Sequence, residues 1–269
     1  MARIIPIADP EDPCLAPYRD IRERDLVGRD GHFIAEGTVV LDVLMRAPCH
    51  RPLSVLIAER RLPGLLPKLE HWPGDVPVYS AADDVIARIA GFSVHRGVLA
   101  LGRSAPPRDP DTALATLSDE ALVLVLIGIA NHDNMGGIFR NAAAFGADLV
   151  LLDGASCDPL YRKAIRVSVG GALLVPFARI PPETDILALL TTHRLPALAL
   201  SPQGTTRLQD LRPMKRAALI LGAEGSGLPP DILARSETLC IPMASGFDSL
   251  NVATTSGIVL HHLRSLRAR

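Results

Sequence analysis

The chain has 269 residues, and its 28 basic side chains against 29 acidic ones give a formal net charge of −1. This balance excludes neither nucleic acid nor a small molecule as partner, because a local basic patch matters more than total charge. No stretch approaches the ~20 apolar residues of a membrane span. The four scattered cysteines offer neither a disulfide framework nor a metal-binding pair, which favours a reducing cytoplasm.

The first hundred residues alternate short strand and helix patterns. Residues 53–59, 76–80 and 96–102 are apolar and read as strands, whereas 62–72 and 81–91 have helical spacing. We therefore expect a small α/β domain over residues 1–103. A proline-rich stretch of small and acidic residues, 104–119, is typical of a linker.

A second α/β domain is expected over residues 120–269. Its near-continuous Val, Ile and Leu strands predict a parallel sheet with helices on both faces, and ligands of such sheets bind beyond the carboxyl ends of the strands. Strands are expected at 122–128, 149–153, 172–175, 197–201, 217–222 and 239–242, and helices at 137–145, 159–170, 184–193, 229–235 and 250–267.

Three loops that follow strands carry unusual polar and glycine patterns. In the first, "NHDNMGGIFR", Asn134 precedes Gly136-Gly137, and Arg140 follows. The glycines would let strand and helix meet closely, and we expect Asn134 and Arg140 to share the mouth of the helix. The loop has neither the G-x-G-x-x-G spacing of a dinucleotide site nor a phosphate-binding loop, which argues against a nucleotide-dependent oxidoreductase.

The second loop, "LILGAEGSGLPP" (219–230), sets Glu224 among glycines that permit close approach of a ligand to the backbone. Glu224 in such a turn commonly organises the loop by accepting backbone N–H bonds. The third loop (240–252) leads into a helix, where Ser249 has the commonest identity of an N-cap. Asn251 is a mediocre helix former and would point back toward the loop.

Together the motifs N-x-x-G-x-x-R (134–140), L-x-L-G-x-E-G-x-G-L (219–228) and I-P-M-x5-S-L-N-V (241–252) resemble the SpoU/TrmH family of RNA 2′-O-ribose methyltransferases. Upstream, "FIAEGTVVLDVLM" and "HRGVLALG" resemble the L30e-like substrate-binding domain that often precedes this catalytic domain. The resemblance implies an α/β trefoil knot with a mainly parallel sheet, a homodimer, S-adenosylmethionine as cofactor and a structured tRNA or rRNA as substrate.

The resemblance also implies site residues. The family's catalytic positions correspond to Arg140, Asn134, Ser249, Asn251 and Glu224, and its cofactor-binding positions to Leu221, Gly222, Glu224, Ile241, Met243, Ser249 and Leu250. The guanidinium of arginine keeps its proton at neutral pH and therefore does not readily act as a base. Arg140 is expected instead to bind the phosphate beside the target ribose and to orient the hydroxyl.

RNA requires positive charge at its binding surface. Candidate RNA-binding residues are Arg46, Arg51, Arg60, Arg61, Arg162, Lys163 and Arg166. The usual alternative is that such basic side chains only face solvent and bind no partner. The histidines form no metal-ligand pattern, and no metal is expected. The alternative function is a non-catalytic RNA-binding or assembly protein that retains the fold.

Overall fold

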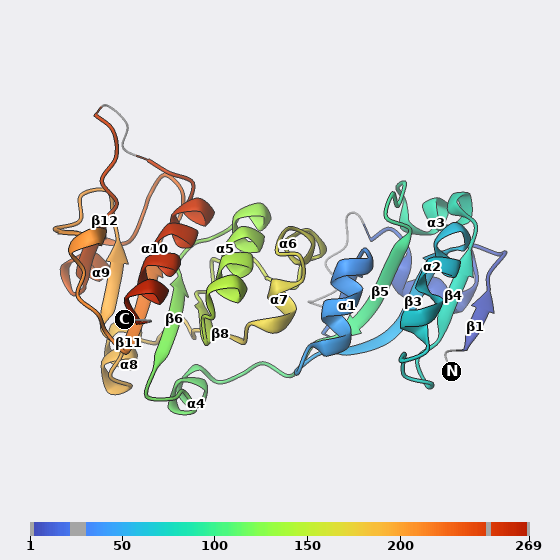
Figure 1. Ribbon diagram of the computed structural model, residues 1–269, viewed down its shortest axis with the longest axis horizontal. Coiled ribbons are helices and arrows are strands. Elements are labelled where there is room, and N and C mark those ends of the chain that lie inside the picture. The colour runs from blue at the N-terminus through green and yellow to red at the C-terminus, as the bar shows by residue number, and fades with distance from the viewer. Residues whose placement is uncertain (1–2, 22–30, 246–248, 268–269) are drawn as a thin grey trace. The chain divides into compact units, whose positions relative to one another are not determined.

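The structure, a computed structural model, describes residues 3–21, 31–245 and 249–267 (Figure 1). The chain forms two compact units, the first made of Met1–Pro106 and Leu160–Leu174 and the second of Pro107–Pro159 and Val175–Arg269. The grouping differs from the expected division mainly at residues 160–174, which belong to the first unit although they follow the linker in sequence. No helix in the described ranges is long and apolar enough to cross a membrane.

The first unit has a mixed five-stranded sheet. The strands lie in the order β1 (Ile4–Pro6), β4 (Val78–Ala81), β3 (Arg51–Ala58), β5 (Val98–Arg103) and β2 (His32–Glu36). β5 runs antiparallel to both neighbours, and the other pairings are parallel. The three strands and two helical stretches expected in this half are confirmed, the helices as α2 (Leu62–Leu69) and α3 (Asp83–Ala90).

The core of the first unit forms where α3 and a 3-10 helix, η1 (Pro13–Tyr18), pack on the alternating apolar residues of β2–β5. Tyr18 is fully buried there, and its hydroxyl lies 2.7 Å from the Ser54 hydroxyl. Helix α1 (Thr38–Arg46) packs against β2, β3 and β5, while α6 (Arg162–Val167) contacts β2, and α7 (Gly171–Leu174) contacts α1. A short 3-10 turn, η2 (Glu59–Arg61), joins β3 to α2.

The second unit has a seven-stranded sheet in which every pairing is parallel. Its order is β10 (Thr206–Arg207), β12 (Glu237–Cys240), β9 (Ala197–Leu200), β11 (Arg216–Leu221), β6 (Ala121–Leu126), β7 (Leu149–Leu152) and β8 (Phe177–Arg179). The predicted parallel sheet is therefore confirmed, and the trefoil knot stays a prediction.

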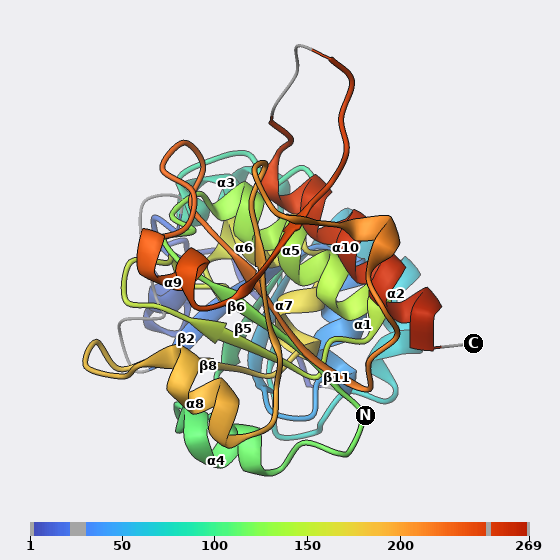
Figure 2. The same cartoon turned by 90° about the vertical axis from the view of Figure 1, so that its left-hand side faces the viewer.

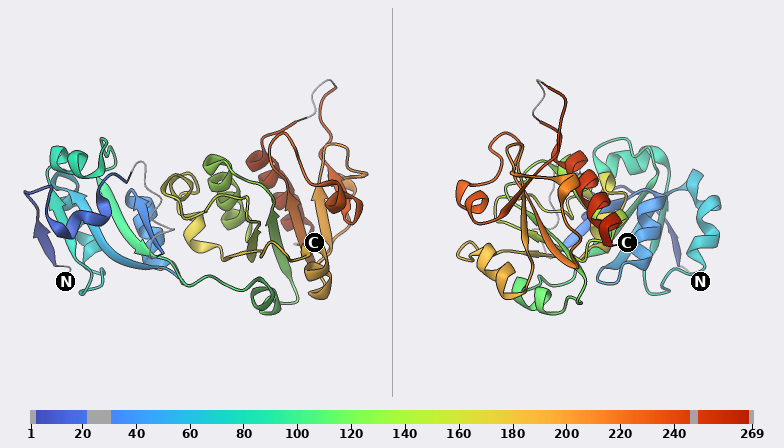
Figure 3. Two further views of the ribbon diagram at one scale, coloured as in Figure 1. Left: turned by 180° about the vertical axis from the view of Figure 1, so that it is seen from behind. Right: turned by 60° about the vertical axis from the view of Figure 1, so that its left-hand side comes forward.

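Helices cover both faces of this sheet (Figures 2 and 3). Helices α4 (Pro110–Ala115), α8 (Ile186–Thr192) and α9 (Pro230–Ala234) share one core with alternate strand residues such as Val123, Val125 and Ile220. The intervening strand residues are also buried, and α5 (His132–Phe145) and α10 (Val252–Arg267) pack together on that side. A 3-10 turn, η3 (Leu208–Asp210), contacts α10.

One expected strand is wrong. Residues 172–175 fall in α7 and the segment after it, and the strand at that place is β8, which begins after Pro176. A short apolar run does not by itself distinguish a buried strand from a buried helix.

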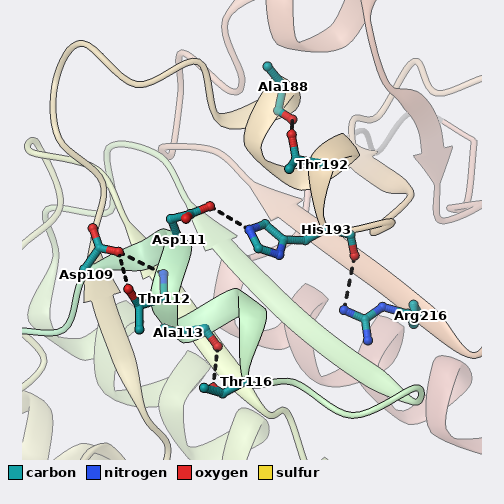
Figure 4. Close-up of polar contacts among 9 residues, drawn as sticks. All are labelled: Asp109, Asp111, Thr112, Ala113, Thr116, Ala188, Thr192, His193 and Arg216. Atoms are coloured by element: carbon teal, nitrogen blue, oxygen red, sulfur yellow. Dashed lines mark hydrogen bonds and ion pairs between the residues drawn. The ribbon is translucent and has the colours of Figure 1, made fainter.

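The segment expected to be a linker contains a helix that is part of the second unit (Figure 4). The Asp109 carboxylate caps α4 by accepting from the Thr112 N–H at 2.8 Å. Leu114 is only 1% exposed in the shared core. The His193 ring also contacts Asp111 at 2.8 Å, and Arg216 donates to the His193 carbonyl. These contacts hold α4 against the end of α8.

Candidate active site

A cavity of about 760 Å³ lies beside the carboxyl ends of β9, β11 and β12. This is the edge where a parallel sheet binds ligands. Its lining comes from residues 200–203, from the loop after β11, from the segment after β12 and from the start of α10. All seven residues predicted to bind a cofactor line it: Leu221, Gly222, Glu224, Ile241, Met243, Ser249 and Leu250.

The loop after β11 folds back on itself so tightly that glycine is required. A Cβ atom on Gly222 would lie 2.5 Å from the carbonyl carbon and oxygen of Gly227. The Gly227 N–H donates to the Ala223 carbonyl at 3.0 Å, and Gly225 and Gly227 have φ angles of 88° and 67°, where side chains are disfavoured. This turn forms one wall of the cavity and presents its backbone to it.

Asn251 links the second and third loops to the first. Its side-chain amide donates to the Oδ1 of Asn134 at 2.8 Å and to the Oε1 of Glu224 at 3.1 Å. Its own Oδ1 accepts from the N–H groups of Ala253 and Thr254. Asn251 is therefore the N-cap of α10, which begins at Val252 instead of Leu250 as expected. The competing interpretation of Ser249 as the cap is wrong.

Helix α5 begins at His132, five residues before its expected start, and the Asn131 side chain caps it. Asn134 consequently lies in the first turn, with only 7% of its surface exposed. Gly137 is inside the helix, where a Cβ atom would lie 2.6 Å from that of Ala253. Its role is thus the close approach of α5 to α10, and for this glycine the expected strand–helix contact is wrong.

Arg140 does not share the helix mouth with Asn134. Six residues of α-helix amount to about 9 Å of rise and place the two side chains roughly 120° apart around the axis. Arg140 is exposed, and among the residues that the structure describes it is not part of the cavity lining. The other four predicted catalytic residues do meet: Glu224, Ser249 and Asn251 line the cavity, and Asn134 bonds to Asn251.

Sequence reasoning missed one wall of the cavity, formed by Leu200 at the end of β9 and by Ser201, Pro202 and Gln203 after it. Their position could have been predicted, because they follow an expected strand of a parallel sheet, where ligands bind. The approach of this loop to β12 depends on Gly204, because a Cβ atom there would lie 2.4 Å from the carbonyl carbon of Leu239.

The candidate RNA-binding arginines of the first unit separate into two groups. Arg46 and Arg51 lie at the end of α1 and the start of β3, whereas Arg60 and Arg61 follow the end of β3. A strand of this length spans about 25 Å, so the four do not form one patch. Arg60 is also paired with Asp83 at 2.7 Å, so part of its charge is already neutralised within the first unit.

The three basic residues of α6 are not equivalent. The Arg162 guanidinium contacts the Oε2 of Glu36 at 2.5 Å and lies 4.7 Å from the centre of the Phe92 ring. Glu36 is 5% exposed, so Arg162 neutralises a buried carboxylate within the first unit and is poorly available to RNA. Lys163 and Arg166 are half-buried.

The described part of the chain contains no cluster of three or more His, Cys, Asp or Glu side chains that could hold a metal. Burial, and secondarily the Asp158 carboxylate, raises the pKa of the Cys157 thiol to about 11. This thiol is therefore protonated at neutral pH and is a weak nucleophile.

Comparison with known proteins agrees with this geometry. The model of the SpoU rRNA methylase family matches residues 121–261. An uncharacterized tRNA/rRNA methyltransferase of Mycobacterium tuberculosis (strain CDC 1551 / Oshkosh) is 39% identical over 95% of this chain and 90% of its own length. The 23S rRNA (guanosine-2′-O-)-methyltransferase RlmB of Acinetobacter baylyi is 30% identical over 76% of this chain and 83% of its own.

Among solved structures, an AdoMet-bound rRNA methyltransferase from Sinorhizobium meliloti superposes with a TM-score of 0.81 at 21% identity, covering 97% of this chain and 98% of that one. This likeness establishes the fold. The matched region contains all three motifs and every residue that builds the cavity. The chain belongs to the SpoU rRNA methylase family of RNA methyltransferases.

Proposed function

We propose that the protein transfers a methyl group from S-adenosylmethionine to a ribose 2′-hydroxyl of a structured tRNA or rRNA. The observation that carries this proposal is the meeting of the three motifs at one cavity, where the Asn251 amide bonds to Glu224 of the lining and to Asn134. The relatives support it, since RlmB is named for a guanosine 2′-O-methylation and the mycobacterial relative as a tRNA/rRNA methyltransferase.

The cavity fits S-adenosylmethionine in size and chemistry. Its volume of about 760 Å³ falls within the roughly 300–1,000 Å³ of small-molecule sites. Leu221, Ile241 and Leu250 would flank the adenine, and the glycine turn at 222–227 would offer backbone groups to the nucleoside. When bound, the cofactor supplies a methyl group on a positively charged sulfur, which a ribose oxygen can attack.

The chain's own residues position the reactants. Because the Asn251 amide donates to both Asn134 and Glu224, it holds these two acceptors in one orientation at the edge of the cavity. Positioning two reactants in line can lower a barrier by as much as about 7–11 kcal/mol. The hydroxyl proton passes to solvent water as the oxygen accepts the methyl group.

The phosphate of an RNA substrate needs a cation, yet no described residue of the cavity lining is basic. Arg140 is exposed, and no hydrogen bond or ion pair to it occurs among the described residues. We infer that the protein is a homodimer in which Arg140 of each chain serves the cavity of the other. Ile258 on α10 and Leu250 at the cavity are 39% and 41% exposed, and such apolar surface suits an interface.

Residues 1–103 would bind the RNA as a substrate-recognition domain. Arg61 and Arg96 both lie near the start of β5, since a Cβ on Gly97 would touch the Arg61 side chain and one on Gly37 would touch the Arg96 side chain. Both arginines are exposed. They provide the phosphate-binding charge that Arg162 does not, and Arg96 was missed in the sequence because it stands alone.

The proposal is tested by binding and by turnover. S-adenosylhomocysteine, but not NAD, should give a calorimetric binding signal, and the protein should methylate total RNA from a strain lacking the gene. Protein that binds this RNA without transferring methyl groups, and does not bind S-adenosylhomocysteine, would instead be a non-catalytic RNA-binding protein.

Shared sites are tested by complementation. Arg140→Ala and Asn251→Ala should each abolish turnover while Arg140→Ala retains cofactor binding. After unfolding and refolding an equal mixture, half of the dimers contain both variants, and each such dimer has one intact site, so about a quarter of wild-type activity should return. Full turnover by Arg140→Ala, or no recovery on mixing, would contradict the shared arrangement.

A further inference from the structure

Helices α5 and α10 pack side by side and in parallel (Figures 1 and 2). Their contacts keep one register along the pair: Asn134 meets Asn251, Gly137 meets Ala253, and the Phe145 ring meets that of His261. The Asn134–Asn251 bond of the active site is thus the first contact in a longer helix–helix interface. A contact that fixes the position of α5 along α10 therefore also keeps the Asn134 and Asn251 amides at 2.8 Å.

Asn141 is placed to fix the position of α5 along α10. It follows Asn134 by seven residues, so it lies on the same face of α5 about two turns on. Its side-chain amide donates to the Ala253 carbonyl at 2.7 Å and to the Ser256 hydroxyl at 3.0 Å. Ser256 is fully buried. These bonds connect α5 to the first turn of α10, directly after the residue that caps it.

The absence of a side chain at Gly257 leaves the space that the Asn141 side chain occupies. A Cβ atom at Gly257 would lie 3.1–3.4 Å from the amide atoms of Asn141, which is closer than an unstrained contact. Close packing of Gly137 on Ala253 already restricts sliding of one helix along the other. The Asn141 amide adds a directional restraint, because both of its hydrogen bonds need acceptors at fixed positions on α10. Asn141 therefore adds a second polar connection between the described parts of α5 and α10, beyond the Asn134–Asn251 bond itself.

We infer that Asn141 is a positioning residue for methyl transfer, because it fixes the axial register of α5 on α10 and thereby the placement of Asn134 against Asn251. It does not belong to the described cavity lining, so it acts on the geometry of the reaction more than on cofactor affinity. This inference rests on the proposed methyl transfer at that site.

The test separates rate from affinity and stability. Because a displacement of about 1 Å can lower a rate as much as 100-fold, Asn141→Ala should slow single-turnover methyl transfer at saturating RNA by roughly 10- to 100-fold. The Kd of S-adenosylhomocysteine should stay within about threefold. Asn141→Asp, which has the same shape but cannot donate, should be at least as slow. Val259→Ala, a control that truncates a fully buried side chain farther along α10, should lower Tm without slowing transfer.

Gly257→Ala tests the same contact from the other helix, because the added methyl group would press on the Asn141 side chain. Alanine is the better helix former, so Tm should hold or rise while the transfer rate falls. In an Asn141→Ala background the same change should have little further effect, since the side chain it displaces is gone. A rate loss that tracks Tm in all variants, an equal loss of affinity and rate, or a fast Asn141→Asp enzyme would overturn the inference.

Crystal structures of the variants test the role of Asn141 without any RNA substrate. If the wild-type protein methylates no RNA, the proposed function fails, but the role of Asn141 is still decided by geometry. The Asn134–Asn251 bond should lengthen beyond hydrogen-bonding distance in Asn141→Ala and stay intact in Val259→Ala. An unchanged bond in Asn141→Ala would refute this role.

Discussion

Replacing Gly222 with alanine probes the turn that forms the wall of the cavity. The added Cβ would lie 2.5 Å from the carbonyl carbon and oxygen of Gly227 and 2.7 Å from the Leu228 nitrogen. Unstrained contacts between such atoms need about 3.5 Å, so one side of the turn must retreat by about 1 Å. All three neighbouring atoms belong to the backbone, and no side-chain rotation can relieve the contact.

Two consequences of this substitution can be measured. Overpacking of this kind costs about 1–3 kcal/mol of folding free energy, which a denaturant titration detects as a lower midpoint. The displaced turn also lines the cavity, and a loss of about 1.4 kcal/mol in binding corresponds to a tenfold weaker Kd. We expect at least that loss for S-adenosylhomocysteine by calorimetry.

Gly154→Ala is the matched control, because a Cβ there meets nothing within 4 Å, and it should change neither quantity. The reasoning is refuted if Gly222→Ala unfolds at the wild-type midpoint. A destabilised Gly222→Ala protein with unchanged affinity would show that the turn moves without affecting the ligand.

Three further changes test other parts of the structure. Asn251→Ala removes the cap of α10, worth about 1 kcal/mol, and leaves the buried Asn134 oxygen without its donor at about 1–3 kcal/mol, so a midpoint shift below 1 kcal/mol would contradict these contacts. Leu114→Ala should destabilise by about 2–5 kcal/mol, whereas a surface helix in a free linker would lose almost nothing. Because the Arg235 guanidinium, together with backbone N–H groups, holds the pKa of Asp185 below its usual range, its stabilisation is complete above about pH 4 and is lost as pH falls through the lowered value. Asp185→Asn should therefore be less acid-sensitive below about pH 4 in thermal melts, and an unchanged acid profile would count against the pairing.

Much of the second unit follows from local sequence. Continuous runs of branched apolar residues can be buried on both faces only in a parallel sheet with helices on either side, and such sheets place their functional loops at one edge. The glycines at 222–227 and the residues around Asn251 could therefore be placed at one edge of the sheet before any coordinates, and the resemblance to a known family assigned them to one site. Their backbone requirements are local, and local patterns record them.

Contacts between distant residues were decided by the tertiary structure. The Asn251–Asn134 bond joins positions 117 residues apart, and nothing near either residue shows that its amide has this partner. The same holds for Gly137, which makes room for Ala253 of another helix, and for Arg162, whose charge is taken up by the buried Glu36.

Short segments were decided by packing as well. The apolar residues around Leu173 suit a strand as well as a helix, and burial in α7 selects the helix. Residues 104–119 are polar and proline-rich, yet Leu114 enters the core of the second unit. In each case the sequence determines which surfaces must be buried, and only the fold determines against what, because the free energy of burial depends on area and not on the identity of the partner.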